Sequence, residues 1–166
     1  MSAGGEQVVL ATGAAGGIGS AVIRRFATGG WRCASADLAA PTESVEYHVA
    51  TDVRSVAACS AAVQSTVNTF GRLDVLVNAA GVWHEGNTAD TREEDFDRVI
   101  DVNLKGTYFM SAAAIPHLET TRGCIINLSS DAGIQGNSGA AAYCASKGGV
   151  SLFTKALALE LAPRGV

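Results

Sequence analysis

Near its N-terminus the sequence places a glycine-rich turn between a short apolar run and a stretch with helical spacing. Residues 7–12 have the composition of a buried strand, and residues 13–19 include four glycines. Residues 20–28 then repeat apolar side chains at the spacing of a helix. A strand, a glycine-rich turn and a helix in this order form the context that a dinucleotide-binding fingerprint requires. The N-terminal part of the chain therefore predicts an α/β fold with a nucleotide site at the turn.

The glycines of this turn suit the approach of a pyrophosphate. Residues without a side chain let the backbone come close to the phosphates, and a helix N-terminus offers free N–H groups and the positive end of a dipole. Gly13, Gly17 and Gly19 are spaced Gly-x-x-x-Gly-x-Gly, which differs from the commonest dinucleotide motif. The alternative is a tight turn that binds no ligand.

An acidic residue follows the second predicted strand. Residues 31–36 form that strand, and Asp37 comes 18 residues after Gly19. A carboxylate here accepts a hydrogen bond from a ribose 2′-hydroxyl and repels a 2′-phosphate. Gly16 adds no positive charge to the turn. We therefore expect NAD(H) to be favoured over NADP(H), the alternative being an ordinary turn residue at a strand end.

Two further strands are expected in the first half of the chain. Residues 44–50 predict the third strand, after which Asp52 and Val53 lie where an adenine would rest. Residues 73–77 are apolar except for Asp74, as in a strand of a parallel sheet that is buried on both faces.

The helix expected between these strands covers residues 55–70 and ends at Gly71. Its inward-facing positions are predicted to be Val56, Ala57, Val63 and Val67.

The second half continues the alternation. Residues 93–103 and 105–118 predict helices, and residues 124–128 predict a fifth strand. Asn103 stands inside a helix, where asparagine is not preferred, so it indicates either a buried polar network or a functional role. The polar loop 82–91 carries Trp83 and His84, and it is either a wall of a substrate cleft or a plain surface loop.

Tyr143 and Lys147 are four residues apart, at the start of a stretch with helical character. On a helix such residues share a face, which places a phenol beside an ammonium. The positive charge favours the phenolate, so Tyr143 is a candidate proton donor and acceptor. The alternative is a half-buried tyrosine with a solvated lysine one turn away.

Parallel strands deliver the residues that follow them to one edge of the sheet. Gly13, Asn78, Ser130 and Tyr143 therefore meet where open α/β sheets bind ligands. The fold class expected is α/β, a doubly wound, Rossmann-like parallel sheet.

The combined motifs resemble the short-chain dehydrogenase/reductase (SDR) family. Residues 12–19 are similar to its cofactor motif, and residues 78–81 to its Asn-Ala-Gly motif. The family's catalytic tetrad matches Asn103, Ser130, Tyr143 and Lys147, where the thirteen-residue step to Tyr143 selects Ser130 over Ser129.

The resemblance implies hydride transfer between a nicotinamide and an alcohol or ketone. Tyr143 would exchange the proton, and Lys147 would favour the phenolate and hold the nicotinamide ribose. Ser130 would hydrogen-bond the substrate oxygen, and Asn103 would hold a water. The implied cofactor-binding residues are Thr12, Gly13, Gly17, Ile18, Gly19, Asp37, Asp52, Val53, Asn78, Ala79, Gly81, Tyr143 and Lys147.

The same resemblance implies that residues 1–166 form a single dinucleotide-binding domain truncated before the sixth strand, with its C-terminal strands missing. The helix after Lys147 is apolar on both sides, with Val150 and Leu157 on one and Leu152 and Leu159 on the other. In the family a partner subunit covers it, so the full-length protein is expected to be a homodimer or homotetramer. Two alternatives stay open: a truncated, inactive dinucleotide-binding module, and an NADP-dependent reductase similar to 3-oxoacyl-carrier-protein reductases.

Composition excludes several other classes of protein. Hydrophobic residues make up 48% and charged residues 17% of the chain, as in globular proteins. The net charge of −4 argues against a nucleic-acid partner, and no apolar run is long enough to predict a membrane span. The four cysteines and three histidines have no metal-ligand spacing, and dispersed cysteines favour a reducing, cytoplasmic location.

Overall fold

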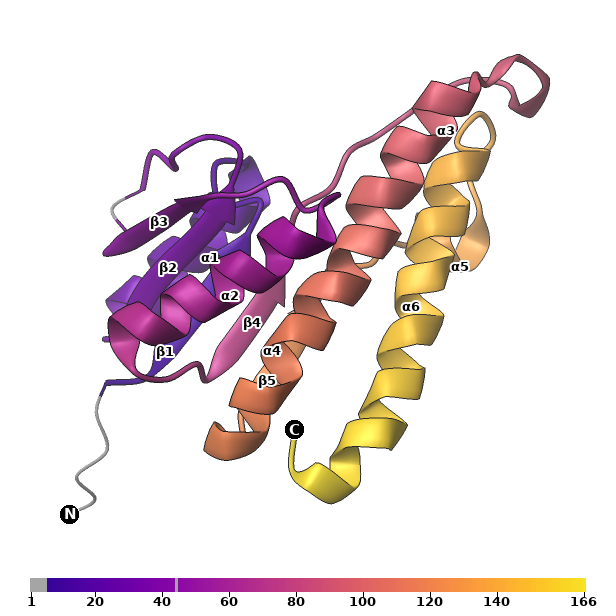
Figure 1. The fold of residues 1–166 in the computed structure, drawn as a ribbon. Coiled ribbons are helices and arrows are strands. Elements are labelled where there is room, and N and C mark those ends of the chain that lie inside the picture. The colour runs from indigo at the N-terminus through magenta and orange to yellow at the C-terminus, as the bar shows by residue number, and fades with distance from the viewer. Residues whose placement is uncertain (1–5, 44) are drawn as a thin grey trace.

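The computed structural model describes residues 6–43 and 45–166 of the chain. Residues 1–5, and Ser44 of the predicted third strand, lie outside the described residues. Strands and helices alternate along most of the described chain (Figure 1). The strands are β1 (Val8–Thr12), β2 (Arg32–Asp37), β3 (Tyr47–Ala50), β4 (Val75–Asn78) and β5 (Cys124–Asn127). The helices are α1 (Gly17–Thr28), α2 (Val56–Phe70), α3 (Glu93–Ile100), α4 (Thr107–Thr121), α5 (Ala132–Gln135) and α6 (Ala141–Leu161).

The strands form one parallel sheet in the order β3-β2-β1-β4-β5. The order reverses direction between β1 and β4, and open α/β sheets bind ligands at such a switch point. The predicted fold class is thus confirmed: a parallel Rossmann-like sheet with helices on both faces.

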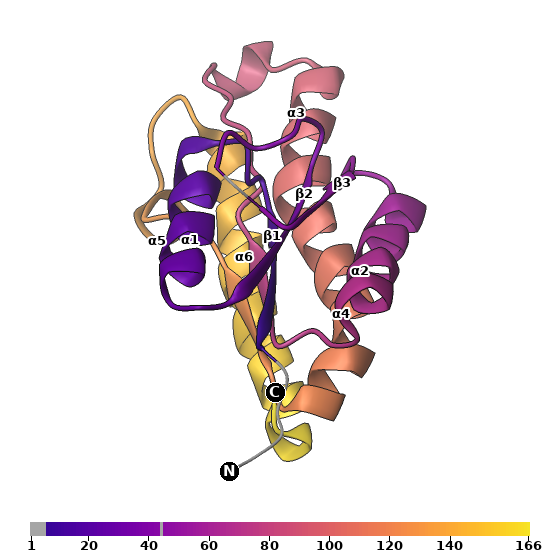
Figure 2. The ribbon, with the colours of Figure 1, turned by 90° about the vertical axis from the view of Figure 1, so that its left-hand side faces the viewer.

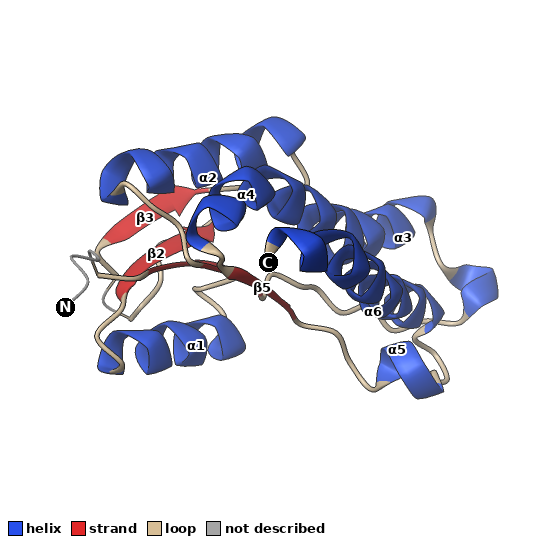
Figure 3. Ribbon diagram, turned by 90° about the horizontal axis from the view of Figure 1, so that it is seen from below, coloured by secondary structure: helices blue, strands red, loops and turns tan. Residues whose placement is uncertain are grey.

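Helices cover the two faces of the sheet, as Figures 2 and 3 show. One core packs α2 and α4 on the sheet, through residues such as Val63 and Met110 against Leu10 and Leu76. The other packs α1 on the opposite face, through Ile23. β1 and β4 are buried along their whole length, as expected for strands covered on both sides.

Asp74, the acidic residue just before β4, is buried because it is fully partnered. Its carboxylate accepts a hydrogen bond from the backbone N–H of Val8 at 2.8 Å and pairs with Arg72 at 2.6 Å. A carboxylate buried beside a paired guanidinium and a backbone donor does not carry the cost of an isolated charge. Asp74 therefore joins β1 to β4 at their amino ends.

Several element predictions needed correction. The third strand is shorter than predicted and begins at Tyr47. In α2, Val63 and Val67 face the core as predicted, but the prediction was wrong for Val56 and Ala57, which are exposed. The face that packs on the sheet instead carries Cys59, Ala62, Val63 and Thr66, at helical spacing.

The helix break predicted near residue 104 is absent. α3 continues through a π-helical segment, Asp101–Gly106, directly into α4, so the chain remains helical from Glu93 to Thr121. A π-helical turn inside an α-helix often marks a functional site.

β5 pairs with β4 only, among the described residues, and its exposure alternates along the strand. α6 lies beside it with one packed and one open side. Val150 and Leu157 are buried, whereas Leu152 is 68% and Leu159 81% exposed. Of the two apolar sides predicted for this helix, one is therefore packed on the fold and the other is open.

Candidate functional site

The glycine-rich turn after β1 packs tightly against the end of β4. Gly13 has a φ of +65°, and a Cβ there would lie 2.6 Å from Ala80 N and 2.7 Å from the carbonyl group of Ala79. A Cβ on Gly19 would overlap the carbonyl of Gly13, whereas one on Gly17 would meet nothing within 4 Å. The inner side of the turn therefore has no room for side chains, and Gly17 stands on its open side, at the N-terminus of α1.

Thr12, the last residue of β1, holds the start of this turn against the end of β4. Its Oγ1 accepts hydrogen bonds from the backbone N–H groups of Ala79 and Ala80, both at 3.1 Å. These two backbone N–H groups come just after the last residue of β4, so the sheet itself offers them no hydrogen-bond acceptor. Thr12 thereby couples the ends of β1 and β4.

A cavity of about 510 Å³ opens in front of the turn, at the carboxyl edge of the sheet. Nine of the predicted cofactor-binding residues line it: Gly13, Gly17, Ile18, Gly19, Asp37, Asp52, Val53, Ala79 and Gly81. Its volume is in the range of ordinary small-molecule and cofactor sites, about 300–1,000 Å³.

Asp37 stands at the end of β2 and faces this cavity. Its carboxylate accepts from Ala15 N in the glycine turn at 3.0 Å and from Ala39 N at 3.3 Å. Two backbone donors therefore hold the carboxylate at the rim, next to the turn. An anion fixed here favours a neutral hydroxyl group over a phosphate.

Asp52 lines the same cavity but is paired with Arg54. The guanidinium donates to both carboxylate oxygens, with the shortest contact 2.7 Å, and these hydrogen bonds lower the pKa of Asp52. Val53 lies against Gly106, where a Cβ would come within 2.8 Å of the valine side chain. The absence of a side chain at Gly106 lets the π-helical segment approach this wall of the cavity.

Asn78 lies behind the cavity and does not line it. The residue is 3% exposed, and its Nδ2 donates to Ser111 Oγ at 3.0 Å and to Asn127 Oδ1 at 2.8 Å. Asn78 thus links β4 to α4 and β5. Like Thr12, it holds the walls of the cavity in place.

The start of α6 presents Tyr143 and Lys147 one turn apart. Lys147 is 6% exposed, and its Nζ donates to the carbonyl of Leu128 at 2.7 Å. The same Nζ lies 5.9 Å from the centre of the Tyr143 ring. Burial lowers the pKa of Lys147 from its ordinary value, because an apolar surrounding disfavours the charged amine.

Asn103 occupies the middle of the π-helical segment and is fully buried. Its Oδ1 accepts from Val82 N at 2.8 Å, and its Nδ2 donates to Val82 O at 3.0 Å and to Ser146 Oγ at 3.0 Å. One side chain therefore joins the helix, the segment after β4 and α6. Of the two interpretations offered for Asn103, a buried polar network or a functional role, the structure shows the buried network.

The two serines after β5 differ in their contacts. Ser129 Oγ donates to Lys147 O at 2.9 Å and also lies 2.6 Å from Ser151 Oγ, so it is engaged with α6. Ser130 Oγ donates to Asp131 Oδ1 at 3.0 Å and accepts from Ala132 N at 3.2 Å. Ser130 is half-buried, whereas Ser129 is exposed. The choice of Ser130 over Ser129 therefore stays a prediction from spacing.

Gly81 joins the cavity to the Tyr143–Lys147 pair. It lines the cavity, and a Cβ built on it would lie 3.5 Å from Asn103 Oδ1 and 3.7 Å from Lys147 Nζ. Asn103, Ser130, Tyr143 and Lys147 do not line the cavity themselves, and Gly81 connects it to Asn103 and Lys147.

The profile of the family described as short chain dehydrogenase matches residues 7–166. The chain belongs to the short chain dehydrogenase family. Meso-2,3-butanediol dehydrogenase of Serratia marcescens is 37% identical over 172 residues, which cover 97% of this chain and 68% of the relative. The NAD(+)-dependent 2-dehydro-3-deoxy-L-rhamnonate dehydrogenase of a Sphingomonas species is 40% identical over 168 residues, with coverage of 95% and 67%.

Among solved structures, 3-ketoacyl-(acyl-carrier-protein) reductase of Brucella melitensis in complex with NADH aligns with a TM-score of 0.90 at 35% identity. The alignment covers 96% of this chain and 72% of that one. The chain is therefore a member of an oxidoreductase family that binds nicotinamide dinucleotides and acts on small molecules. Within residues 6–43 and 45–166, no helix has the length and apolar character needed to cross a membrane.

The cavity of this short chain dehydrogenase fits such a cofactor in its dimensions and donor set. The N-terminus of α1 supplies N–H groups at the open side of Gly17, and the inner glycines leave no side chain in the way. Asp37 places a hydrogen-bond acceptor at the rim of the cavity, next to the same turn.

Sequence reasoning missed the two cations that line this cavity, Arg54 and Arg98. Arg54 comes directly after the predicted pair Asp52 and Val53, and this proximity was the available signal for it. Arg98 lies on α3 four residues before Val102, which also lines the cavity, and this helical spacing was the available signal.

Proposed function

We propose that the protein is an NAD(H)-dependent oxidoreductase that interconverts an alcohol and a ketone, with Tyr143 as the acid and base. The observation that carries the cofactor preference is the carboxylate of Asp37, fixed at the cavity rim by the N–H groups of Ala15 and Ala39. The two cations that line the cavity are elsewhere engaged: Arg54 with Asp52, and Arg98 with the carbonyl of Trp83 at 3.5 Å.

The relatives give further support. One of them is named for NAD(+), and the Brucella reductase was solved with NADH. These names describe the cofactors of those proteins. For this chain, the proposed preference for NAD(H) depends on Asp37.

The proposed chemistry uses side chains from three elements. When bound, the nicotinamide supplies or accepts the hydride. Tyr143 gives its phenolic proton to a carbonyl oxygen or takes one from an alcohol. Lys147, with its ammonium 5.9 Å from the phenol ring, favours the phenolate and binds the nicotinamide ribose.

Ser130 and Asn103 complete the proposed tetrad. The Ser130 hydroxyl would turn from Asp131 to the substrate oxygen and stabilise the charge that develops there. Asn103 Oδ1 accepts one hydrogen bond, from Val82 N, so it has a lone pair left, and it lies 3.5 Å from the position of a Cβ on Gly81. A water held there would connect to Lys147.

Two rival functions are to be distinguished. A ketoacyl-carrier-protein reductase is suggested by the name of the Brucella relative, and an inactive dinucleotide-binding module would retain the same cavity without turnover. Asp37 argues against an NADP-dependent form of the former.

The test measures cofactor affinity and turnover separately. NADH and NADPH are titrated into the protein by the change in cofactor fluorescence, and ketone-dependent loss of NADH absorbance is then recorded. Tight NADH binding with turnover supports the proposal, whereas binding without turnover supports the module. Tighter NADPH than NADH binding would contradict the assignment of Asp37.

We also propose self-association through the open side of α6 and the neighbouring part of α4. Tyr108 of α4 is 48% exposed and packs on Phe153 of α6 with ring centres 4.9 Å apart, and Leu152 and Leu159 of α6 are also exposed. Light scattering of the protein and of a Leu159→Glu variant tests this, because a buried carboxylate would dissociate the assembly. The cytoplasmic location stays a prediction.

A further inference from the structure

Trp83 lies directly against the tyrosine that we propose as acid and base. The ring centres of Trp83 and Tyr143 are 4.4 Å apart and the ring planes are inclined by 58°. Trp83 is nevertheless 48% exposed, so a large part of its apolar surface remains open beside Tyr143. Covering such a half-exposed indole with another apolar group is favourable, because it removes apolar surface from water.

The backbone that carries Trp83 is anchored to the site. Both backbone polar groups of Val82 bind the Asn103 side chain, and Arg98 donates to Trp83 O at 3.5 Å. Further along the same loop, Gly86 N donates to Gly139 O at 2.7 Å, which ties it to the segment before α6. The indole therefore has a defined position relative to Tyr143.

Near this pair the carboxylates of Glu85 and Asp131 are exposed, whereas the cations Lys147 and Arg98 are each engaged with a backbone carbonyl. Asp131 accepts from Ser130, the hydroxyl proposed to bind the substrate oxygen, and the Glu85 side chain approaches Gly139, where a Cβ would be 3.8 Å from Glu85 Cγ. Lys147 is buried against Leu128 O. A neutral substrate is therefore favoured at this end of the site over an anionic one.

We propose that Trp83 is a specificity-determining residue that selects neutral secondary alcohols and ketones whose reacting carbon belongs to an apolar ring. The open indole surface packs on that ring while the reacting oxygen meets Tyr143. This inference rests on the proposed function, because it takes Tyr143 as the group that meets the substrate oxygen.

The kinetic test compares two neutral alcohols, cyclohexanol and 2-butanol, in the wild type and in Trp83→Ala and Trp83→Phe variants. We expect the ratio of kcat/KM for cyclohexanol over that for 2-butanol to fall about tenfold or more in Trp83→Ala, since the lost contact covers much of an indole face. Trp83→Phe keeps an aromatic ring and should restore most of the ratio. An equal loss for both alcohols in Trp83→Ala would overturn the inference and reduce Trp83 to a packing residue.

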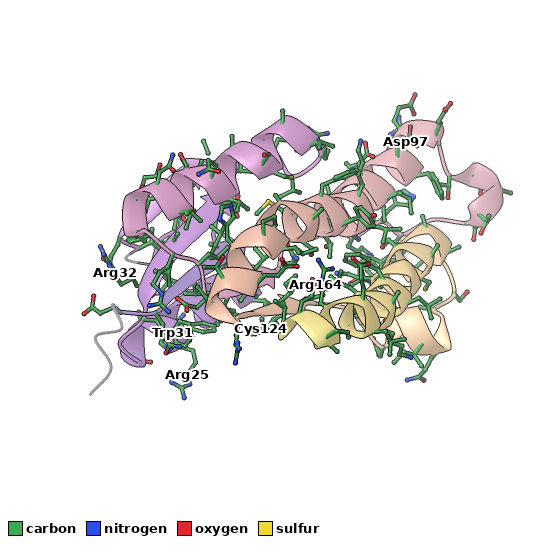
Figure 4. The ribbon with its side chains drawn as sticks, turned by 60° about the horizontal axis from the view of Figure 1, so that its bottom comes forward. Arg25, Trp31, Arg32, Asp97, Cys124 and Arg164 are labelled. Atoms are coloured by element: carbon green, nitrogen blue, oxygen red, sulfur yellow. The ribbon has the colours of Figure 1, made fainter. Side chains whose placement is uncertain are left out.

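A binding test does not depend on turnover. The chain has two tryptophans, and Trp31 packs on Phe26 at the amino end of β2, with ring centres 5.0 Å apart. Figure 4 shows Trp31 at one end of the molecule and Asp97 of α3 at the other. A Trp31→Phe variant therefore leaves Trp83 as the sole fluorescent indole.

In the Trp31→Phe variant, with NAD⁺ present, cyclohexanol should shift the Trp83 emission to shorter wavelength in a saturable way. 2-Butanol at the same concentrations serves as the control and should give a much smaller shift. If the protein shows no turnover but the saturable shift is present, the proposed activity fails and the binding site stands. If cyclohexanol and 2-butanol give the same response, the inference about Trp83 is overturned.

Discussion

Replacement of Gly13 by alanine tests how tightly the turn is packed against β4. The residue has a φ of +65°, and an L-residue in the left-handed region costs about 1–2 kcal/mol. The new Cβ would start 2.6 Å from Ala80 N and 2.7 Å from Ala79, so these backbone atoms must recede. That movement breaks or stretches the two hydrogen bonds to Thr12 Oγ1, each worth about 1 kcal/mol. The expected loss of unfolding free energy is therefore about 3–4 kcal/mol.

Two matched glycines separate these contributions. Gly30 has a φ of +79° but nothing within 4 Å of its Cβ position. Gly30→Ala should therefore lower the free energy of unfolding only by the cost of the left-handed backbone conformation, about 1–2 kcal/mol. Gly17 has neither a positive φ nor a close neighbour, so Gly17→Ala should leave the stability unchanged or slightly raised.

Urea unfolding measures all three variants. With a slope of about 2 kcal/mol per molar, the Gly13→Ala midpoint should fall by roughly 1.5–2 M, about twice the fall of Gly30→Ala. Equal midpoints for Gly13→Ala and Gly30→Ala would refute the idea that the turn is pressed against Ala79 and Ala80.

Three further predictions concern the site. Asp37→Ala should reduce the ratio of NADPH to NADH dissociation constants about tenfold or more, as measured by cofactor fluorescence, because the carboxylate that repels a 2′-phosphate is gone; an unchanged ratio would remove Asp37 from the site. Tyr143→Phe should lower kcat by about a hundredfold or more while NADH affinity changes less than threefold, since only the proton-carrying hydroxyl is lost; substantial residual turnover argues against the proton role. Burial lowers the folded-state pKa of Lys147, so the unfolded state binds more protons between that pKa and the ordinary 10.5, and stability rises with pH there. The wild type should thus gain stability relative to Lys147→Met between pH 7 and pH 10 in urea unfolding, with the exposed Lys155→Met as the control; a pH-independent difference would contradict the buried, depressed amine.

Patterns dominated by local composition were predictable from the sequence. The turn after β1, the continuous apolar run of β4 and the i,i+4 pair Tyr143–Lys147 each carry their structural context in neighbouring residues. Parallel pairing then brings them to one edge without any knowledge of side-chain contacts.

Features that depend on tertiary contacts were not predictable in the same way. No helix was predicted between residues 128 and 141, yet this stretch contains the short helix α5, in which Gly133 packs directly on the Lys147–Gly148 backbone. The π-helical segment escaped detection because no residue type marks it, and the segment is held by the contacts of Asn103 with Val82 and Ser146.

The contacts of Asn103 and Thr12 also have a consequence for entry into the cavity. Both side chains fasten residues 79–82 to the rest of the fold, so that wall has little freedom to swing. We therefore expect residues 79–82 to keep one conformation with and without a bound ligand, so that a ligand has to fit this wall as it stands.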